Sequence, residues 1–290
     1  KAVDWINSRA GKEEPFFLYL ALPAPHTPIL PTGEFIGISN TNPYGDFVVM
    51  VDYMVGRIAD AVEDNKIAKN TIMIFTSDNG CSPEADLEQL KSLGHSPGYI
   101  YRGHKSDIFE GGHRVPFIVK WPSKISPGRK SVKTVSLNDI MATMADILGY
   151  ELPADAAEDS YSMLPIITGD QSAYDRESII HHSANGYFAI RKDRWKLNVC
   201  AGSGGWSHPT EREAEEMELP WFQLYDLDDD PEEDNNIAND HPAIVSELKE
   251  LLYRHISEGR STPGKSQDNT PAEDWPENKL KYEITYGRNK

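Results

Sequence analysis

Continuous apolar runs alternate along the chain with segments whose apolar positions recur every three or four residues, a pattern that predicts an α/β protein. Three β-prone runs predict buried strands: PFFLYLAL (15–22), TIMIFTS (71–77) and VPFIVKW (115–121). A helix over about 45–64 is predicted from its apolar stripe, which comprises Val48, Val51, Val55, Ile58 and Val62. SLNDIMATMADILGY (136–150) predicts another helix, with Ser136 or Asn138 as N-cap and Gly149 as the stop.

The pattern changes after about residue 172. SIIHHS (178–183), YFAIRKDRWKLNV (187–199) with a turn at Asp193, and FQLYDL (222–227) follow one another closely, as turn-linked antiparallel strands do. HPAIVSELKELLYRHI (241–256) predicts a helix with Pro242 at its start. We therefore predict a mostly parallel sheet flanked by helices over 1–171, a smaller antiparallel sheet plus helix over 172–258, and a polar tail over 259–290.

The net charge of the chain excludes some classes of binding partner. The 290 residues carry a formal net charge of −17, which argues against nucleic acid or an anionic membrane surface. Residues 91–130, however, hold eight Lys or Arg against two acids, so this stretch favours a small anionic substrate or forms a solvated face. No apolar run is long enough to span a membrane. The first residues read as part of a surface helix, so we expect upstream sequence.

Candidate chemistry follows the predicted strands, because ligands of such sheets gather beyond the carboxyl ends of the strands. His26 follows the first strand, and Asp78-Asn79 follows the second. A carboxylate beside an amide oxygen can bind Ca²⁺ or Mg²⁺, although the same pair can simply form an Asx turn. Lys105 lies in a glycine-bearing turn, where it is either a solvated loop residue or a point charge for an oxyanion.

Four motifs occur in a familiar order: PFFLYLALPAPHTP (15–28), TIMIFTSDNG (71–80), RGHKSDIFEGGHRVPFIVKWP (102–122) and LYDLDDDPEEDNNIA (224–238). Together they resemble the C-terminal part of a type I sulfatase of the alkaline-phosphatase superfamily, over residues 1–258. The resemblance implies an alkaline-phosphatase-like fold and hydrolysis of a sulfate ester.

The resemblance also implies roles for four residues. Asp78 and Asn79 would be two ligands of a cation, usually Ca²⁺ with Mg²⁺ as the alternative. His26 would contact the sulfate near the leaving oxygen, and Lys105 would contact the sulfate as well. A cation, a lysine and a histidine acid each suit the charge that develops as a sulfate ester is cleaved.

The family's nucleophile is a formylglycine made from Cys or Ser in a Cys/Ser-x-Pro-x-Arg motif. Cys81 begins CSPEA, in which Ala85 stands where the motif has Arg, and Cys200 is followed by neither Pro nor Arg. We therefore read Cys81 as a small loop residue and expect the formylglycine, with further acidic ligands, in N-terminal sequence that this chain lacks. The alternative is an inactive relative, and in either case we expect this chain alone to be inactive.

The C-terminal part resembles versions found in bacterial sulfatases of sulfated sugars, so we expect a sulfated small molecule or glycan as substrate and, from the family alone, a periplasmic or secreted location. The candidate substrate contacts are Arg102, His104, His113, His181, His182, Lys196, Trp206 and His208. Trp195 and Lys196 could instead merely alternate along a half-buried strand. We expect Arg114 to brace its loop against Glu110 or another carboxylate.

Two other functions remain open. A phosphodiesterase or phosphatase of the same superfamily would keep the Asp78-Asn79 strand end, but the EGGHRVP segment (110–116) argues against it. A sugar-binding relative without catalytic activity could also keep the fold. The sequence does not name the sulfated substrate, and it leaves the oligomeric state open.

Overall fold

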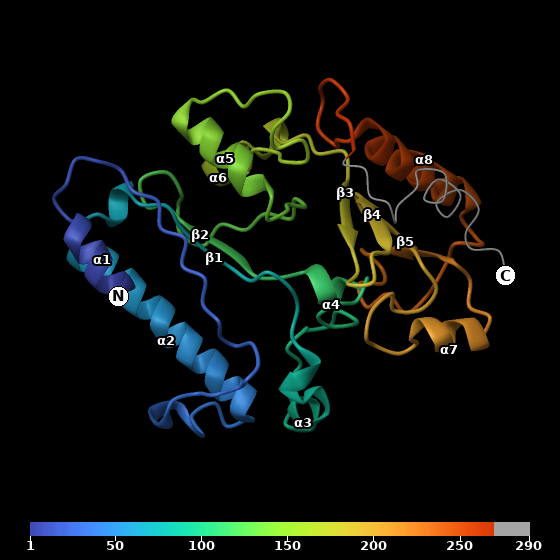
Figure 1. The fold of residues 1–290 in the computed structure, drawn as a ribbon, viewed down its shortest axis with the longest axis horizontal. Coiled ribbons are helices and arrows are strands. Elements are labelled where there is room, and N and C mark those ends of the chain that lie inside the picture. Colours follow the sequence, from blue (N-terminus) through green and yellow to red (C-terminus); the bar gives the residue numbers. More distant parts are fainter. Residues whose placement is uncertain (270–290) are drawn as a thin grey trace. The chain divides into compact units, whose positions relative to one another are not determined.

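The computed structural model describes residues 1–269, which contain small antiparallel sheets and many short helices (Figure 1). The chain divides into two compact units. The first comprises residues 1–77, 81–99 and 116–129, and the second comprises 78–80, 100–115 and the rest of the chain from 130. No helix within residues 1–269 is long and apolar enough to cross a membrane.

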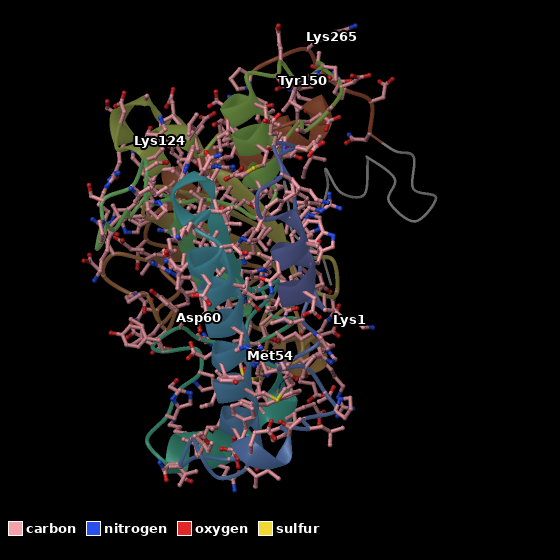
Figure 2. The ribbon with its side chains drawn as sticks, turned by 90° about the vertical axis from the view of Figure 1, so that its left-hand side faces the viewer. Lys1, Met54, Asp60, Lys124, Tyr150 and Lys265 are labelled. Carbon is pink, nitrogen blue, oxygen red and sulfur yellow. The ribbon has the colours of Figure 1, made fainter. Side chains whose placement is uncertain are left out.

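The first unit is built around one long helix. Its elements are α1 (Ala2–Arg9), α2 (Pro43–Asp64), β1 (Met73–Thr76), α3 (Leu87–Ser92), β2 (Phe117–Lys120) and the 3-10 turns Gly33–Phe35, Ala68–Asn70 and Pro83–Ala85. The predicted helix is α2, which begins where the Asn42 side chain accepts a bond from the Gly45 N–H and Pro43 occupies the first turn. Figure 2 shows α1 lying along α2, and Ile6 of α1 packs against Ala61 and Val62.

The parallel sheet predicted for the first unit is not present among the described residues. β1 and β2 form where we predicted strands, but they pair with each other and run antiparallel. The run 15–22 forms no strand, and its Phe17 and Tyr19 are 73% and 81% exposed. These two predictions are wrong for this chain, because the run has the composition of a buried strand but no neighbouring strand within residues 1–269 to pair with it.

The second unit contains the antiparallel sheet, as predicted. Its elements are α4 (Glu110–His113), α5 (Asp139–Leu148), α6 (Leu164–Thr168), β3 (Ile179–His182), β4 (Phe188–Lys192), β5 (Trp195–Val199), α7 (Glu211–Glu216), β6 (Phe222–Asp226), α8 (Pro242–Glu258) and the 3-10 turn Gln171–Ala173. The strands pair in chain order, and Asp193 makes the β4–β5 turn with a positive φ of 52°. Gly149 ends α5 in the left-handed conformation, as expected.

Each face of this sheet packs against a different segment, because successive side chains of a strand point to opposite faces. One face carries Phe188, Ile190 and Leu197, which pack against Leu248 and Leu252 of α8. Figure 1 shows α8 beside strands β3 to β5. The other face carries Tyr187, Ala189 and Tyr225, and these contact Ile108 and Phe109. The sheet therefore supports the segment 102–113, which contains Lys105.

The predicted tail, 259–290, lies partly outside the described residues. Its first part, 259–269, folds back on the second unit. Arg260 is buried, and its guanidinium donates to the Ala154 and Lys265 carbonyls at 3.1 and 2.9 Å. The chain therefore continues to pack beyond the predicted end of the subdomain at 258.

We expect Leu197→Ala to lower the free energy of unfolding by about 2–5 kcal/mol, because Leu197 is fully buried between the sheet and α8. Leu148, 77% exposed at the end of α5, offers the matched control, and Leu148→Ala should change that free energy by less than about 0.5 kcal/mol. Urea unfolding followed by circular dichroism would compare the two variants. Equal effects would contradict the described core.

Candidate active site

Two glycine contacts join the Asp78-Asn79 turn to the Lys105 segment, and a third tightens that segment itself. The Gly80 N–H donates to the Gly112 carbonyl at 3.0 Å, and a Cβ on Gly80 would lie 1.8 Å from the Gly111 oxygen. A Cβ on Gly111 would lie 2.5 Å from the Arg102 oxygen, which also accepts the Gly111 N–H. Only glycine permits backbones to approach this closely. The structure therefore brings two sequence motifs together through main-chain contact.

Lys105 occupies the tip of a tight turn. The Asp107 N–H donates to the His104 carbonyl at 3.1 Å, and Ser106 has a φ of +85°, so residues 104–107 have the features of a type II turn. A serine with that φ is strained, and the neighbouring carboxylate compensates because Asp107 Oδ2 accepts the His104 N–H at 2.8 Å. The turn fixes the backbone from which the Lys105 amine extends.

Asp78 and Asn79 follow β1 after one intervening residue, at the predicted strand end, and the Asp78 side chain is exposed. Asn79 Nδ2 donates to the Gly80 carbonyl at 2.9 Å. A hard cation would bind the other atom of this amide, the side-chain oxygen. These two side chains supply suitable donors, but the described residues contain no cluster of three or more His, Cys, Asp or Glu that could hold a metal. A cation here would need further ligands.

His26 lies on the exposed turn after the 15–22 run, in the first unit. Its N–H donates to the Pro23 carbonyl at 3.1 Å, and its Nδ1 lies 2.8 Å from the Thr27 oxygen. Its role in a site with Lys105 stays a prediction.

Cys81 does not have the properties of a nucleophile. Burial raises the pKa of its thiol, with a smaller opposing effect from a hydrogen bond to Tyr44, so the reactive thiolate is disfavoured. Its Sγ donates to the Ser82 carbonyl at 3.4 Å. This agrees with our interpretation of Cys81 as a loop residue.

Lys196, predicted as a sugar contact, is instead fully buried. Its amine lies 2.9 Å from Glu233 and 3.1 Å from Glu110, and both carboxylates are themselves buried. Glu233 also accepts the Glu110 N–H at 2.5 Å. The prediction is corrected because β5 directs this side chain inward, where it neutralises two acids rather than reaching a ligand.

Two further predicted contacts also brace the Lys105 segment. Arg102 Nη1 donates to the Glu233 carbonyl at 2.8 Å, and its guanidinium lies 4.1 Å from the centre of the Phe109 ring. His104 Nδ1 lies 2.9 Å from the Lys105 oxygen. Arg114 lies 3.3 Å from Glu110, which confirms the bracing role expected of it.

The histidines occupy different environments. His113 and His181 stack with ring centres 4.1 Å apart, and burial lowers the pKa of both, to about 4 for His113. His181 Nε2 lies 3.2 Å from the Ile108 oxygen, whereas His113 Nε2 is buried without a hydrogen-bond partner. His182 is exposed at the end of β3 with its ring against Phe188. The His113 and His181 rings therefore pack against the Lys105 segment, whereas His182 lies on the other face of the sheet.

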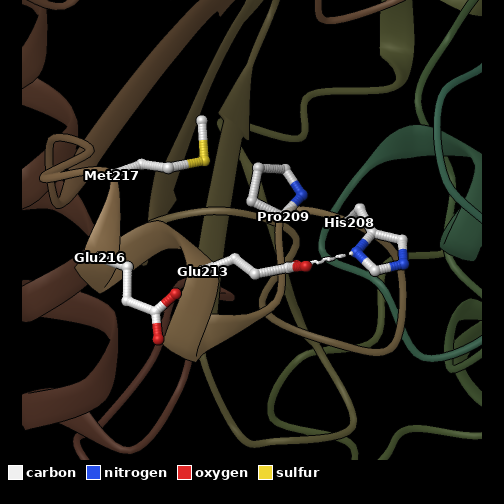
Figure 3. Close-up of a pocket in the computed structure, with 5 residues that line it drawn as sticks. All are labelled: His208, Pro209, Glu213, Glu216 and Met217. Carbon is white, nitrogen blue, oxygen red and sulfur yellow. Dashed lines mark hydrogen bonds and ion pairs between the residues drawn. The ribbon is translucent and has the colours of Figure 1, made fainter.

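His208 and Trp206 remain at the surface. His208 Nδ1 lies 2.7 Å from Glu213 Oε2, and its side chain is 83% exposed (Figure 3). It lines an open hollow with Pro209, Glu213, Glu216 and Met217, and this hollow includes neither Lys105 nor Asp78. Trp206 is 54% exposed. The two are the predicted sugar contacts with the most open side chains.

Sequence reasoning missed two buried acids that organise the segment. Asp107 accepts bonds from both its own turn and residues 206–207, and Glu233 binds Lys196. Glu233 lies within an acidic run (DDDPEED, 228–234), where nothing distinguishes it from its solvated neighbours. Asp107 offered only a weak signal, as one of two acids in the cationic stretch 91–130.

Comparison with known proteins shows that the chain is similar to members of the sulfatase family. The model of the Sulfatase family matches residues 1–150, and that of the N-sulphoglucosamine sulphohydrolase C-terminal region matches residues 104–258. An N-acetylgalactosamine-6-O-sulfatase of Bacteroides thetaiotaomicron is 40% identical over 87% of this chain and 49% of its own length. Mouse steryl-sulfatase is 35% identical over 64% of this chain and 29% of its own length.

A solved structure from the glycosaminoglycan metabolism of Bacteroides thetaiotaomicron has the same fold. It is 37% identical, with a TM-score of 0.75 over 87% of this chain and 52% of that chain. This chain thus spans about half the length of that structure and of the Bacteroides relative.

Proposed function

Because this chain belongs to the sulfatase family of the alkaline-phosphatase superfamily, we propose that the intact protein hydrolyses a sulfate ester. The observation that carries the proposal is the glycine-mediated contact between the Asp78-Asn79 turn and the Lys105 segment. Because of this contact, the Asp78-Asn79 turn and the Lys105 turn belong to the same unit. A site that binds both a cation and an anionic ester requires acidic and basic side chains of this kind close together.

Each residue has a chemical task in this proposal. Lys105 would hold the sulfuryl oxygens as their negative charge grows, and His26 would protonate the departing alkoxide oxygen. Asp78 and Asn79 would hold a divalent cation, Ca²⁺ or alternatively Mg²⁺, which would polarise the sulfuryl group. The buried acids Asp107 and Glu233 keep the Lys105 turn in place.

The attacking group would come from outside residues 1–290. Neither cysteine of this chain lies in the family's formylglycine motif, and the raised pKa of Cys81 disfavours its direct attack. We therefore propose that a formylglycine and further cation ligands belong to the other half of the intact protein, because this chain spans about half of its Bacteroides relative.

A sulfated carbohydrate is the substrate class that we favour. The relative with 40% identity over most of this chain is an N-acetylgalactosamine-6-O-sulfatase, whereas the steryl-sulfatase matches a shorter part with lower identity. The exposed Trp206, whose N–H is bonded to Asp107 of the Lys105 segment, and the exposed His208 suit a sugar ring with polar groups. From the family alone we also propose a periplasmic or secreted location.

An activity assay on the full-length product of the encoding reading frame tests the proposal. We expect hydrolysis of N-acetylgalactosamine 6-sulfate, loss of turnover on removal of divalent cations, recovery with Ca²⁺, and no turnover by residues 1–290 alone. A phosphodiester should be a much poorer substrate. Preference for the phosphodiester would favour the phosphodiesterase alternative, and sugar binding without turnover would favour a non-catalytic relative. Turnover by residues 1–290 alone would contradict the external nucleophile.

A further inference from the structure

Residues 202–209 form a closed loop that packs directly on the Lys105 turn. The Trp206 N–H donates to Ser106 Oγ at 3.0 Å and to Asp107 Oδ1 at 2.9 Å, and the Ser207 N–H donates to Asp107 Oδ1 at 3.0 Å. The Asp107 side chain is fully buried, and its other oxygen accepts the His104 N–H. One carboxylate therefore ties the backbone of Trp206 to the turn that carries Lys105.

Glycines make this approach possible. A Cβ on Gly205 would lie 2.5 Å from the Ser106 oxygen and 2.6 Å from Asp107 Oδ1, so a larger residue would push the loop away. Gly204 has a φ of +62°, and a Cβ on it would lie 3.0 Å from the Cys200 sulfur. The loop is closed on itself because the Ser203 N–H donates to the Pro209 carbonyl at 2.8 Å and Ser203 Oγ donates to the Ser207 carbonyl.

The Trp206 side chain is exposed although the loop that carries it is buried and extensively hydrogen-bonded. Gly202, Ser203 and Gly204 are buried, yet the Trp206 side chain is 54% exposed, and no other tryptophan within residues 1–269 is classed as exposed. A single exposed apolar side chain is ordinary on a protein surface. Here, however, the Trp206 N–H is bonded to Ser106 and Asp107, so the backbone that carries the ring is held against the turn that carries Lys105.

We propose that Trp206 is the platform on which the sugar ring of the sulfated substrate packs while Lys105 binds its sulfate. The inference rests on the proposed function and adds the residue that selects a carbohydrate. An indole presents a broad apolar face with little rotameric freedom, which suits the C–H face of a pyranose. His208, two residues further along the chain, has an exposed side chain whose Nδ1 is paired with Glu213, so its other ring nitrogen can meet a hydroxyl. Asp107 is a positioning residue: it holds the backbone of Trp206 against the turn that carries Lys105.

Comparing a sulfated sugar with inorganic sulfate distinguishes the role of Trp206 from that of Lys105. In the full-length protein, Trp206→Ala should raise KM for N-acetylgalactosamine 6-sulfate at least about 10-fold, because it removes the apolar face on which the sugar ring packs. The inhibition constant of inorganic sulfate, which has no ring, should change less than about 2-fold. Trp206→Phe should keep most of the affinity, and Tyr150→Ala, which removes an exposed aromatic after α5, should change neither constant.

Each outcome is decisive. An equal loss for the sugar sulfate and for inorganic sulfate, or no loss for either, would overturn the platform. If the wild-type protein hydrolyses no sulfate ester but binds the sugar sulfate in calorimetry, the proposed function fails, while the Trp206→Ala comparison of binding still decides on the platform. If the wild-type protein binds neither the sugar sulfate nor inorganic sulfate, both proposals fail.

Discussion

Replacing Lys105 with alanine in the full-length protein should lower kcat/KM for a sulfate ester by about 10²–10³-fold. A preorganised donor aimed at an oxyanion contributes about 3–4 kcal/mol to the transition state, and the Lys105 backbone is preorganised by the 104–107 turn and by Asp107. The measurement is steady-state turnover of N-acetylgalactosamine 6-sulfate, with protein integrity checked by thermal unfolding.

Two variants sharpen this test. Lys105→Arg keeps the charge but changes its shape, so it should recover only part of the activity. Lys133→Ala removes an exposed lysine from the same unit and should leave kcat/KM within about 2-fold, because distant exposed charges are screened. If Lys105→Ala behaves like Lys133→Ala, Lys105 does not contact the sulfate.

Replacing Lys196 with methionine should lower the free energy of unfolding by about 3–5 kcal/mol at neutral pH. The change leaves Glu110 and Glu233 buried without the cation between them, and breaking a buried ion pair from one side costs that much. Lys192→Met, on the neighbouring strand, removes an amine from a partly exposed pair with Glu247 and should cost less than about 1 kcal/mol. Urea unfolding of both variants provides the measurement.

The pH dependence of the stability lost in Lys196→Met tests whether the unpaired buried carboxylates cause that loss. In the wild-type protein, burial outweighs Lys196 and raises the pKa of Glu233, whereas for Glu110 burial is outweighed by Lys196, Arg191 and Arg114, which together lower its pKa. Without Lys196 the pKa of Glu233 should rise further. A raised carboxyl pKa in the folded state favours folding below the unfolded pKa and opposes it as pH rises.

The loss caused by Lys196→Met should therefore shrink as pH falls from 8 towards 5. Adding Glu233→Gln should recover part of the lost stability at neutral pH, because the amide needs no counter-charge. A loss that is independent of pH, or equal to that of Lys192→Met, would show that the charges of the triad do not stabilise the fold.

The sequence predicted local elements well because their signals are local. The apolar stripe of α2, the glycine that ends α5, the turn at Asp193 and the order of strands β3 to β6 all follow from residues near one another in the chain. The run 15–22 failed because pairing is not local: its composition indicates burial, but burial requires strands that residues 1–269 do not supply.

The candidate site shows the same division. Its motifs could be located from sequence, since Asp78, Asn79 and Lys105 follow identifiable strands and turns. The side of the sheet on which Lys196 lies could not be predicted. Alternation along β5 does not say which face is buried, and that depends on the packing of the sheet against Ile108 and Phe109. Nor does the sequence reveal that Asp107 connects to residues a hundred positions away.

The exposed run 15–22 has a practical consequence for handling this chain. From Phe16 to Leu22 it offers seven consecutive uncharged, β-prone residues without proline, and such windows drive intermolecular strand pairing when they are solvent-accessible. We therefore expect material consisting of residues 1–290 alone to self-associate, and a charged substitution within this stretch to reduce that association.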